Sequence, residues 1–191
     1  MIGIKYLPKD LDIKDKKVIV RLDLNVPLKD KKIQDYTRIL LTLPLLNNLV
    51  KKKAKVTIIT HLGRPQGLRD NEMSLLPIYK YLKKKINTNI YFYTGEINNE
   101  TKEKSSHLKA GEILLLENIR FCKGETENDE TFAKKLASLG DIYINDAFSC
   151  SHRKQSSIHG ITKFVKEFYA GPLLKEEVTA IDSVIQNKKK P

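Results

Sequence analysis

The chain has 191 residues, of which 40% are hydrophobic and 30% are charged, a balance typical of a globular domain that can bury a core. No apolar run reaches the roughly 18 residues needed to cross a bilayer, and the N-terminus lacks the apolar stretch of a signal peptide, so we expect a cytoplasmic protein without a membrane partner. The formal net charge is +12, but a basic nucleic-acid-binding protein is the weaker interpretation, because no nucleic-acid-binding motif accompanies the charge.

Short apolar runs rich in β-branched residues recur along the chain and predict strands. They occupy residues 18–22, 56–59, 90–93, 113–116 and 142–144. Each run is nearly continuous in apolar side chains, as in strands of a parallel sheet that are covered on both faces.

Helical patterns lie between these runs. Helices are predicted over residues 38–52, 75–86, 129–139 and 172–188, with a weaker polar segment at 98–108. Ser74 is a predicted N-cap and Gly140 a predicted C-terminal stop. In the first three segments the apolar side chains share one helical face: Ile39, Leu43, Leu46 and Val50, then Leu75, Leu76, Tyr79 and Leu82, then Phe132, Leu136 and Leu139.

The alternation of strands and helices predicts a three-layer α/β/α, Rossmann-like domain. We expect a mostly parallel, twisted sheet of about six strands with helices on both faces and right-handed crossovers. The last helix looks like a connector rather than part of the core.

Arginine is rare in this chain, and its positions indicate an anion pocket. Only six of the 35 basic residues are arginine. Ligands of parallel α/β sheets bind at the carboxyl ends of the strands, and that edge collects Arg38, Arg64, Arg120 and Arg153 together with His61. Arginine binds phosphate and carboxylate in a bidentate manner, so the cluster suits a ligand with several negative charges. For each arginine alone, a surface ion pair is the alternative.

Other polar residues at the same edge have two interpretations. Asp23 and Asn25 follow the first strand and either bind a ligand hydroxyl or form an Asx-turn. His61 and His152 are either acid–base groups or structural histidines. The sequence contains no phosphate-binding GxxxxGK[ST] loop, no GxGxxG, no HExxH and no GxSxG motif. Cys122 and Cys150 are predicted to be reduced thiols.

Five segments resemble, in the same order, signature sequences of the phosphoglycerate kinase family. They are RLDLNVP at 21–27, THLGRP at 60–65, LENIRF at 116–121, NDAFSCSHR at 145–153 and AGPLLKEE at 170–177. The chain departs from the family pattern at Thr60, at Ser151 and at Gln155, where the family often has a second histidine.

The resemblance implies a glycolytic phosphotransferase with a carboxyl group as acceptor. Members transfer a phosphoryl group reversibly between 1,3-bisphosphoglycerate and ADP, giving 3-phosphoglycerate and ATP. By resemblance, residues 1–171 form the N-terminal phosphoglycerate-binding domain and residues 172–191 begin the interdomain helix. Mg²⁺ with ADP or ATP would be bound by a C-terminal domain absent from this chain. We expect a monomer that is inactive by itself; a stand-alone anion-binding domain is the alternative.

The resemblance also implies roles for individual residues. Arg64, Arg120 and Arg153 would hold the substrate phosphate together with His61, and Asp23 and Asn25 would bind its hydroxyl and carboxyl end. Arg38 would be catalytic, because it would neutralise the charge on the transferring phosphoryl group. No cofactor or metal site is expected in this chain. The full expected substrate site comprises Asp23, Leu24, Asn25, Arg38, His61, Leu62, Gly63, Arg64, Arg120 and Arg153.

Overall fold

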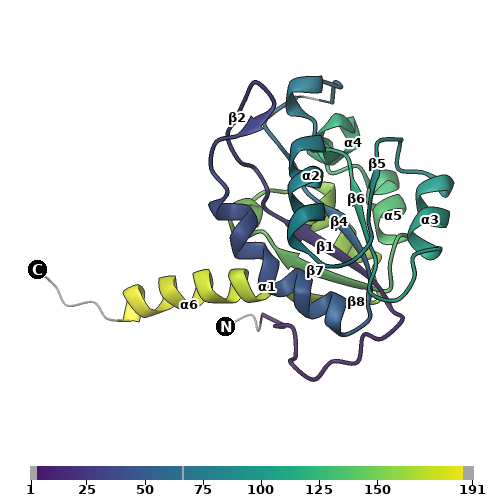
Figure 1. The fold of residues 1–191 in the computed structure, drawn as a ribbon. Coiled ribbons are helices and arrows are strands. Elements are labelled where there is room, and N and C mark those ends of the chain that lie inside the picture. Colours follow the sequence, from purple (N-terminus) through teal and green to yellow (C-terminus); the bar gives the residue numbers. More distant parts are fainter. Residues whose placement is uncertain (1–3, 66, 187–191) are drawn as a thin grey trace, which may run out of the picture.

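The computed structural model describes residues 4–65 and 67–186, and its centre is a six-stranded parallel sheet (Figure 1). The strands of the sheet are β1 (Lys17–Leu22), β4 (Lys55–Ile59), β5 (Ile90–Tyr93), β6 (Ile113–Leu116), β7 (Ile142–Asp146) and β8 (Glu167–Ala170). Their spatial order is β5-β6-β4-β1-β7-β8. Two short strands, β2 (Leu28–Lys29) and β3 (Lys32–Ile33), form a separate antiparallel hairpin.

Helices cover both faces of the sheet, which confirms the predicted three-layer architecture (Figure 1). They are α1 (Thr37–Lys51), α2 (Leu76–Lys85), α3 (Asn99–Ser106), α4 (Lys123–Glu127), α5 (Glu130–Ala137) and α6 (Pro172–Gln186). Helices α1 and α2 pack on one face, and α3 and α5 lie on the other. In the described residues no helix is both long and apolar enough to span a membrane.

The central strand β1 divides its side chains between two hydrophobic cores. Val18, Val20 and Leu22 pack with the buried residues of α1 and α2, whereas Ile19 packs with those of α5. Because side chains alternate along a strand, Arg21 is directed to the same face as Ile19.

Several predicted details are wrong at the level of single residues. The buried stripe of α1 includes Leu45 and Leu49, whereas Leu43 and Val50 are only half-buried. Leu75 occupies the N-cap of α2, although the hydroxyl of Ser74 still accepts a hydrogen bond from the Leu76 amide at 3.2 Å. Leu76, predicted on the apolar face of this helix, is 40% exposed. The boundaries of both helices shifted by a residue, because backbone geometry, not composition, decides where a helix begins.

The predicted helix over 129–139 is shorter than expected, and Gly140 does not cap it. Helix α5 ends at Ala137, with Ser138 as its C-cap. A Cβ on Gly140 would lie 2.9 Å from the carbonyl oxygen of Lys17. The glycine therefore allows close packing against β1 and does not supply a left-handed turn.

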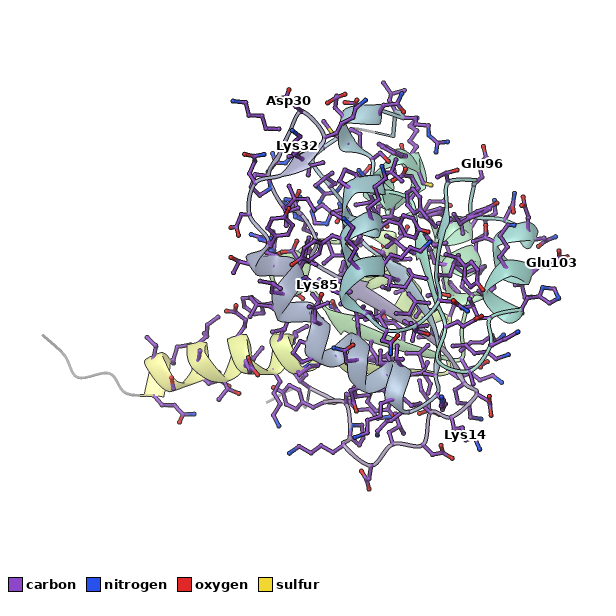
Figure 2. The ribbon with its side chains drawn as sticks, in the orientation of Figure 1. Lys14, Asp30, Lys32, Lys85, Glu96 and Glu103 are labelled. Atoms are coloured by element: carbon purple, nitrogen blue, oxygen red, sulfur yellow. The ribbon has the colours of Figure 1, made fainter. Side chains whose placement is uncertain are left out.

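Charged side chains extend from the periphery of the domain, as Figure 2 shows for Lys14, Asp30, Lys32, Glu96 and Glu103. The lysines of the last turn of α2 are exposed, where they complement the helix dipole. Much of the net positive charge is therefore solvated surface.

Helix α6 projects away from the body of the domain (Figure 1), and its first turn is held by the last residue of β7. Oδ1 of Asp146 accepts a hydrogen bond from the Leu174 amide at 3.1 Å, and burial raises the pKa of this carboxyl to about 6. A Cβ on Gly171 would lie 2.4 Å from Oδ1, so the glycine makes the contact possible. The predicted end of this helix at residue 188 lies outside the described residues.

We expect Asp146→Asn to gain stability relative to the wild type as the pH rises from 3.8, the ordinary carboxyl value, to about 6. In this window the native chain binds more protons at Asp146 than the unfolded chain, so ionisation costs the native state free energy. The asparagine keeps the Oδ1 acceptor without the charge. Asp146→Ala loses the acceptor and should cost about 1 kcal/mol. Urea unfolding above and below the window tests this; a pH-independent difference between Asp146→Asn and the wild type would contradict it.

Candidate anion-binding site

The predicted site lies at a switch point of the sheet. From β1 the chain first crosses to β4 on one side, and later returns to β7 on the other side of β1. Parallel α/β sheets bind ligands outside the carboxyl ends of strands at such a point. The segments that follow β1, β4, β6 and β7 meet there.

Arg21, the penultimate residue of β1, is completely buried, and each of its three side-chain nitrogens has a protein partner. Its Nε donates to Ser157 Oγ at 3.0 Å, one terminal nitrogen donates to the Leu22 carbonyl, and the other lies 3.0 Å from His61 Nδ1. Arg21 belongs to the RLDLNVP motif, but the expected substrate site does not include it. Its partner Ser157 is distant in the sequence, so no local pattern could reveal the contact.

A buried carboxylate compensates the charge of Arg21 through Ser157. Glu125 is fully buried and accepts hydrogen bonds from the amide of Ser157 at 2.8 Å and from its hydroxyl at 2.6 Å. Tyr143 donates to the Ser157 carbonyl at 2.6 Å. Burial raises the pKa of Glu125, and the charge of Arg21 opposes that rise.

His61 lies at the centre of the arginine cluster. Burial, together with the positive charges of Arg21, Arg120, Arg153 and Arg38, lowers the pKa of His61 to about 2. The ring is therefore neutral at physiological pH. Cys150, which we predicted only as a reduced thiol, is buried with its Sγ 3.9 Å from His61 Nδ1.

Arg120 and Arg153 have donors that the protein does not use. One terminal nitrogen of Arg120 donates to the Gly63 carbonyl at 2.6 Å, but its Nε and other terminal nitrogen are buried without a partner, as is Nε of Arg153. Burial and the nearby charge of Arg153 lower the pKa of Arg120. Buried N–H groups without partners are rare and costly, so these donors mark the place where an anion fits.

Asp23 and Asn25 both have structural partners. Asp23 accepts hydrogen bonds from Arg38 and Ser149 and from the Asn25 amide at 3.2 Å, which forms the Asx-turn. Asn25 Oδ1 accepts from the Gly63 amide at 2.9 Å and so connects two loops of the site. Their binding of a ligand hydroxyl stays a prediction.

The remaining predicted residues differ in exposure. Leu24 and Leu62 are buried, and their amides are bonded to Thr60 and Asn118; their contact with a ligand stays a prediction. Arg64 is exposed, and the described residues give it no hydrogen bond or ion pair. Of the four predicted arginines, Arg64 is therefore the one that the structure does not bring into the cluster around His61.

Gly63 is required by the geometry of its loop. Its φ is +62°, and a Cβ there would lie 2.6 Å from the sulfur of Met73. The glycine lets its carbonyl reach Arg120 and its amide reach Asn25. The loop of 60–65 is thus held from both sides of the site.

In residues 4–65 and 67–186 no group of three His, Cys, Asp or Glu side chains could hold a metal ion.

A cavity of about 540 Å³ lies beside β5, at an edge of the sheet, and is lined by Tyr79, Tyr91, Tyr93, Lys104 and Lys109 among others.

We expect Arg120→Met to raise the melting temperature of the ligand-free chain, because it removes a buried cation next to Arg153. The gain should be on the order of 1 kcal/mol. Inorganic phosphate should stabilise the wild type and not the variant. Arg69→Met is the control, because Arg69 is exposed and donates only to the Thr94 carbonyl. Calorimetry measures all three chains; a lower melting temperature for Arg120→Met with undiminished phosphate stabilisation would count against the assignment.

Comparison with known proteins agrees with the geometry. The family model for phosphoglycerate kinase matches residues 8–191. Phosphoglycerate kinase from Buchnera aphidicola is 46% identical over 95% of this chain and 46% of its own length, and that from a Wolbachia species is 45% identical over 96% and 46%. The chain thus spans about half the length of these relatives.

Solved structures show the same relationship. The structure of phosphoglycerate kinase from Coxiella burnetii matches with a TM-score of 0.85 at 39% identity, over 95% of this chain and 45% of the other. That from Pyrococcus horikoshii OT3 matches with a TM-score of 0.86 at 29% identity, over 97% and 47%. This chain belongs to the phosphoglycerate kinase family.

Proposed function

We propose that this chain binds 3-phosphoglycerate and 1,3-bisphosphoglycerate as one half of a phosphoglycerate kinase. The observation that carries the proposal is the set of buried, unpartnered N–H groups on Arg120 and Arg153. A phosphate group accepts hydrogen bonds from several donors at once and suits arginine geometry. It would satisfy these donors and neutralise the charges that crowd His61.

Arg38 is the candidate catalytic residue. It opens α1, its side chain is 47% exposed, and the carboxylate of Asp23 holds it in place. A phosphoryl group in transfer carries developing charge, and enzymes stabilise it by positioning cations around it rather than by acid–base catalysis. Arg38 would supply such a cation from a position anchored to β1 through Asp23.

Nucleotide chemistry would come from a second domain. No phosphate-binding loop motif occurs in residues 1–191. We propose that Mg²⁺ with ADP or ATP is held outside this chain, and that closure of the two halves brings the reactants into line and excludes water. The chain alone would bind the acid and would not turn it over.

We expect isothermal titration of this chain with 3-phosphoglycerate to release heat, and titration with MgADP to give none. The arginine donors bind the acid, whereas no nucleotide site is expected. A coupled assay with both substrates should show no turnover. Turnover by the pure chain, or binding of MgADP with the same strength as the acid, would contradict the proposal.

We expect Arg38→Ala, in an enzyme that contains both halves, to lower kcat by about 10³-fold or more. The KM for 3-phosphoglycerate should change little, because the interaction forms mainly in the transition state. Arg38→Lys, which keeps the charge but not the bidentate geometry, should retain part of the rate. Steady-state kinetics decide the question, since equal losses in kcat and affinity would place Arg38 in ground-state binding.

A further inference from the structure

We infer that Arg21 is a positioning residue that fixes His61 as a neutral ring with its proton on Nε2, so that Nε2–H serves as a donor to the bound anion. The second clause of this inference rests on the proposed function; the first does not.

A guanidinium group only donates hydrogen bonds. The terminal nitrogen of Arg21 lies 3.0 Å from Nδ1 of His61, so Nδ1 must be the acceptor and cannot carry a proton. A neutral imidazole has one protonated nitrogen. The proton of His61 is therefore on Nε2.

Nε2 is the nitrogen that a ligand can reach. The hydrogen bonds of the described residues involve Nδ1 of His61 and not Nε2, and Nε2 is not among the buried atoms without partners. It is thus accessible, although the residue as a whole is only 4% exposed. A fixed Nε2–H adds a neutral donor to a site whose other donors are cationic.

The hydrogen bonds of Arg21 fix its contact with His61 and leave none of its nitrogens without a protein partner. Its three nitrogens all have protein partners, in contrast to Arg120 and Arg153. Ser157 fixes Nε, and Glu125 fixes Ser157. The backbone at Ser157 belongs to a π-helical turn, Ser156–Gly160, an irregularity that often occurs at functional sites.

The charged and titratable groups around His61 favour the same state. Those that act on the ring are Arg21, Arg120, Arg153, Arg38 and the thiol of Cys150. Two carboxylates belong to this cluster: Asp23 is paired with Arg38, and Glu125 reaches Arg21 through Ser157. A positively charged His61 would face four cations, and it would also have to give up the Arg21 contact.

The test is the protonation pattern of the His61 ring in the wild-type chain. Long-range ¹H–¹⁵N correlation NMR distinguishes a proton on Nε2 from one on Nδ1 and from a charged ring. A His61→Asn sample assigns the signal among the four histidines. We expect a single Nε2–H form that does not change between about pH 5 and pH 8, the range in which histidines usually titrate. A proton on Nδ1, or a charged ring in this range, overturns the inference.

A pair of variants isolates Arg21. Arg21→Met alone would leave Glu125 buried without its cation, so the variant to use is Arg21→Met with Glu125→Gln, and Glu125→Gln alone is the matched control. We expect the control to keep the Nε2–H form and the double variant to show both neutral forms, because burial and the three remaining cations still keep the ring neutral. An unchanged ring in the double variant overturns the role of Arg21.

Binding of 3-phosphoglycerate to the same two variants tests the second clause. The double variant should bind about tenfold more weakly than Glu125→Gln, the effect of losing one hydrogen bond to a charged group. Equal affinities would overturn the donor role of Nε2–H. If the wild-type chain does not bind the acid at all, the proposed function fails. The NMR experiment still decides, independently of binding, which nitrogen of the His61 ring carries the proton.

Discussion

A guanidinium group buried completely at the end of the central strand is the constraint around which the site is organised. Burying a charge is costly unless hydrogen bonds and an opposite charge compensate it. Arg21 obtains both from residues far along the chain, because Ser157 bonds to its Nε and Glu125 bonds to Ser157. The π-helical turn Ser156–Gly160 and the helix α4 are therefore held against the end of β1. The loop that carries His61 is held there too, through its contact with Arg21.

The ligand-free site carries more positive charge than the protein neutralises. Asp23 pairs with Arg38, and Glu125 compensates the charge of Arg21 through Ser157. Among the ion pairs of the described residues, none includes Arg120 or Arg153. Sites that must bind an anion commonly sacrifice stability in this way. The charge imbalance and the unpartnered N–H groups have the same explanation, since one phosphate group would relieve both.

The fold was largely predictable from the sequence, because buried parallel strands appear as continuous apolar runs. All five predicted runs are strands of the sheet. The sixth strand, β8, was not located, since its first two residues are exposed at the edge of the sheet and interrupt the pattern. The hairpin of β2 and β3 was not located either, because strands of two residues are too short for periodicity to detect.

The site was predictable as a location but not as a network. The rule for parallel sheets placed Arg38, Arg120, Arg153 and His61 correctly at one edge, and the structure brings them together. It could not tell which arginines keep donors without a protein partner, because that depends on contacts across long stretches of sequence. Arg21 is the clearest case, because only its contacts with Ser157 and His61, in other parts of the chain, reveal its role.

A crystal structure of the chain with 3-phosphoglycerate bound tests the central claim most directly. The account predicts that the phosphate oxygens accept hydrogen bonds from Nε and the free terminal nitrogen of Arg120 and from Nε of Arg153, with Arg21 still bonded to Ser157 and His61. A ligand bound instead in the tyrosine-lined cavity beside β5, or Arg21 turned from Ser157 toward the ligand, would contradict it.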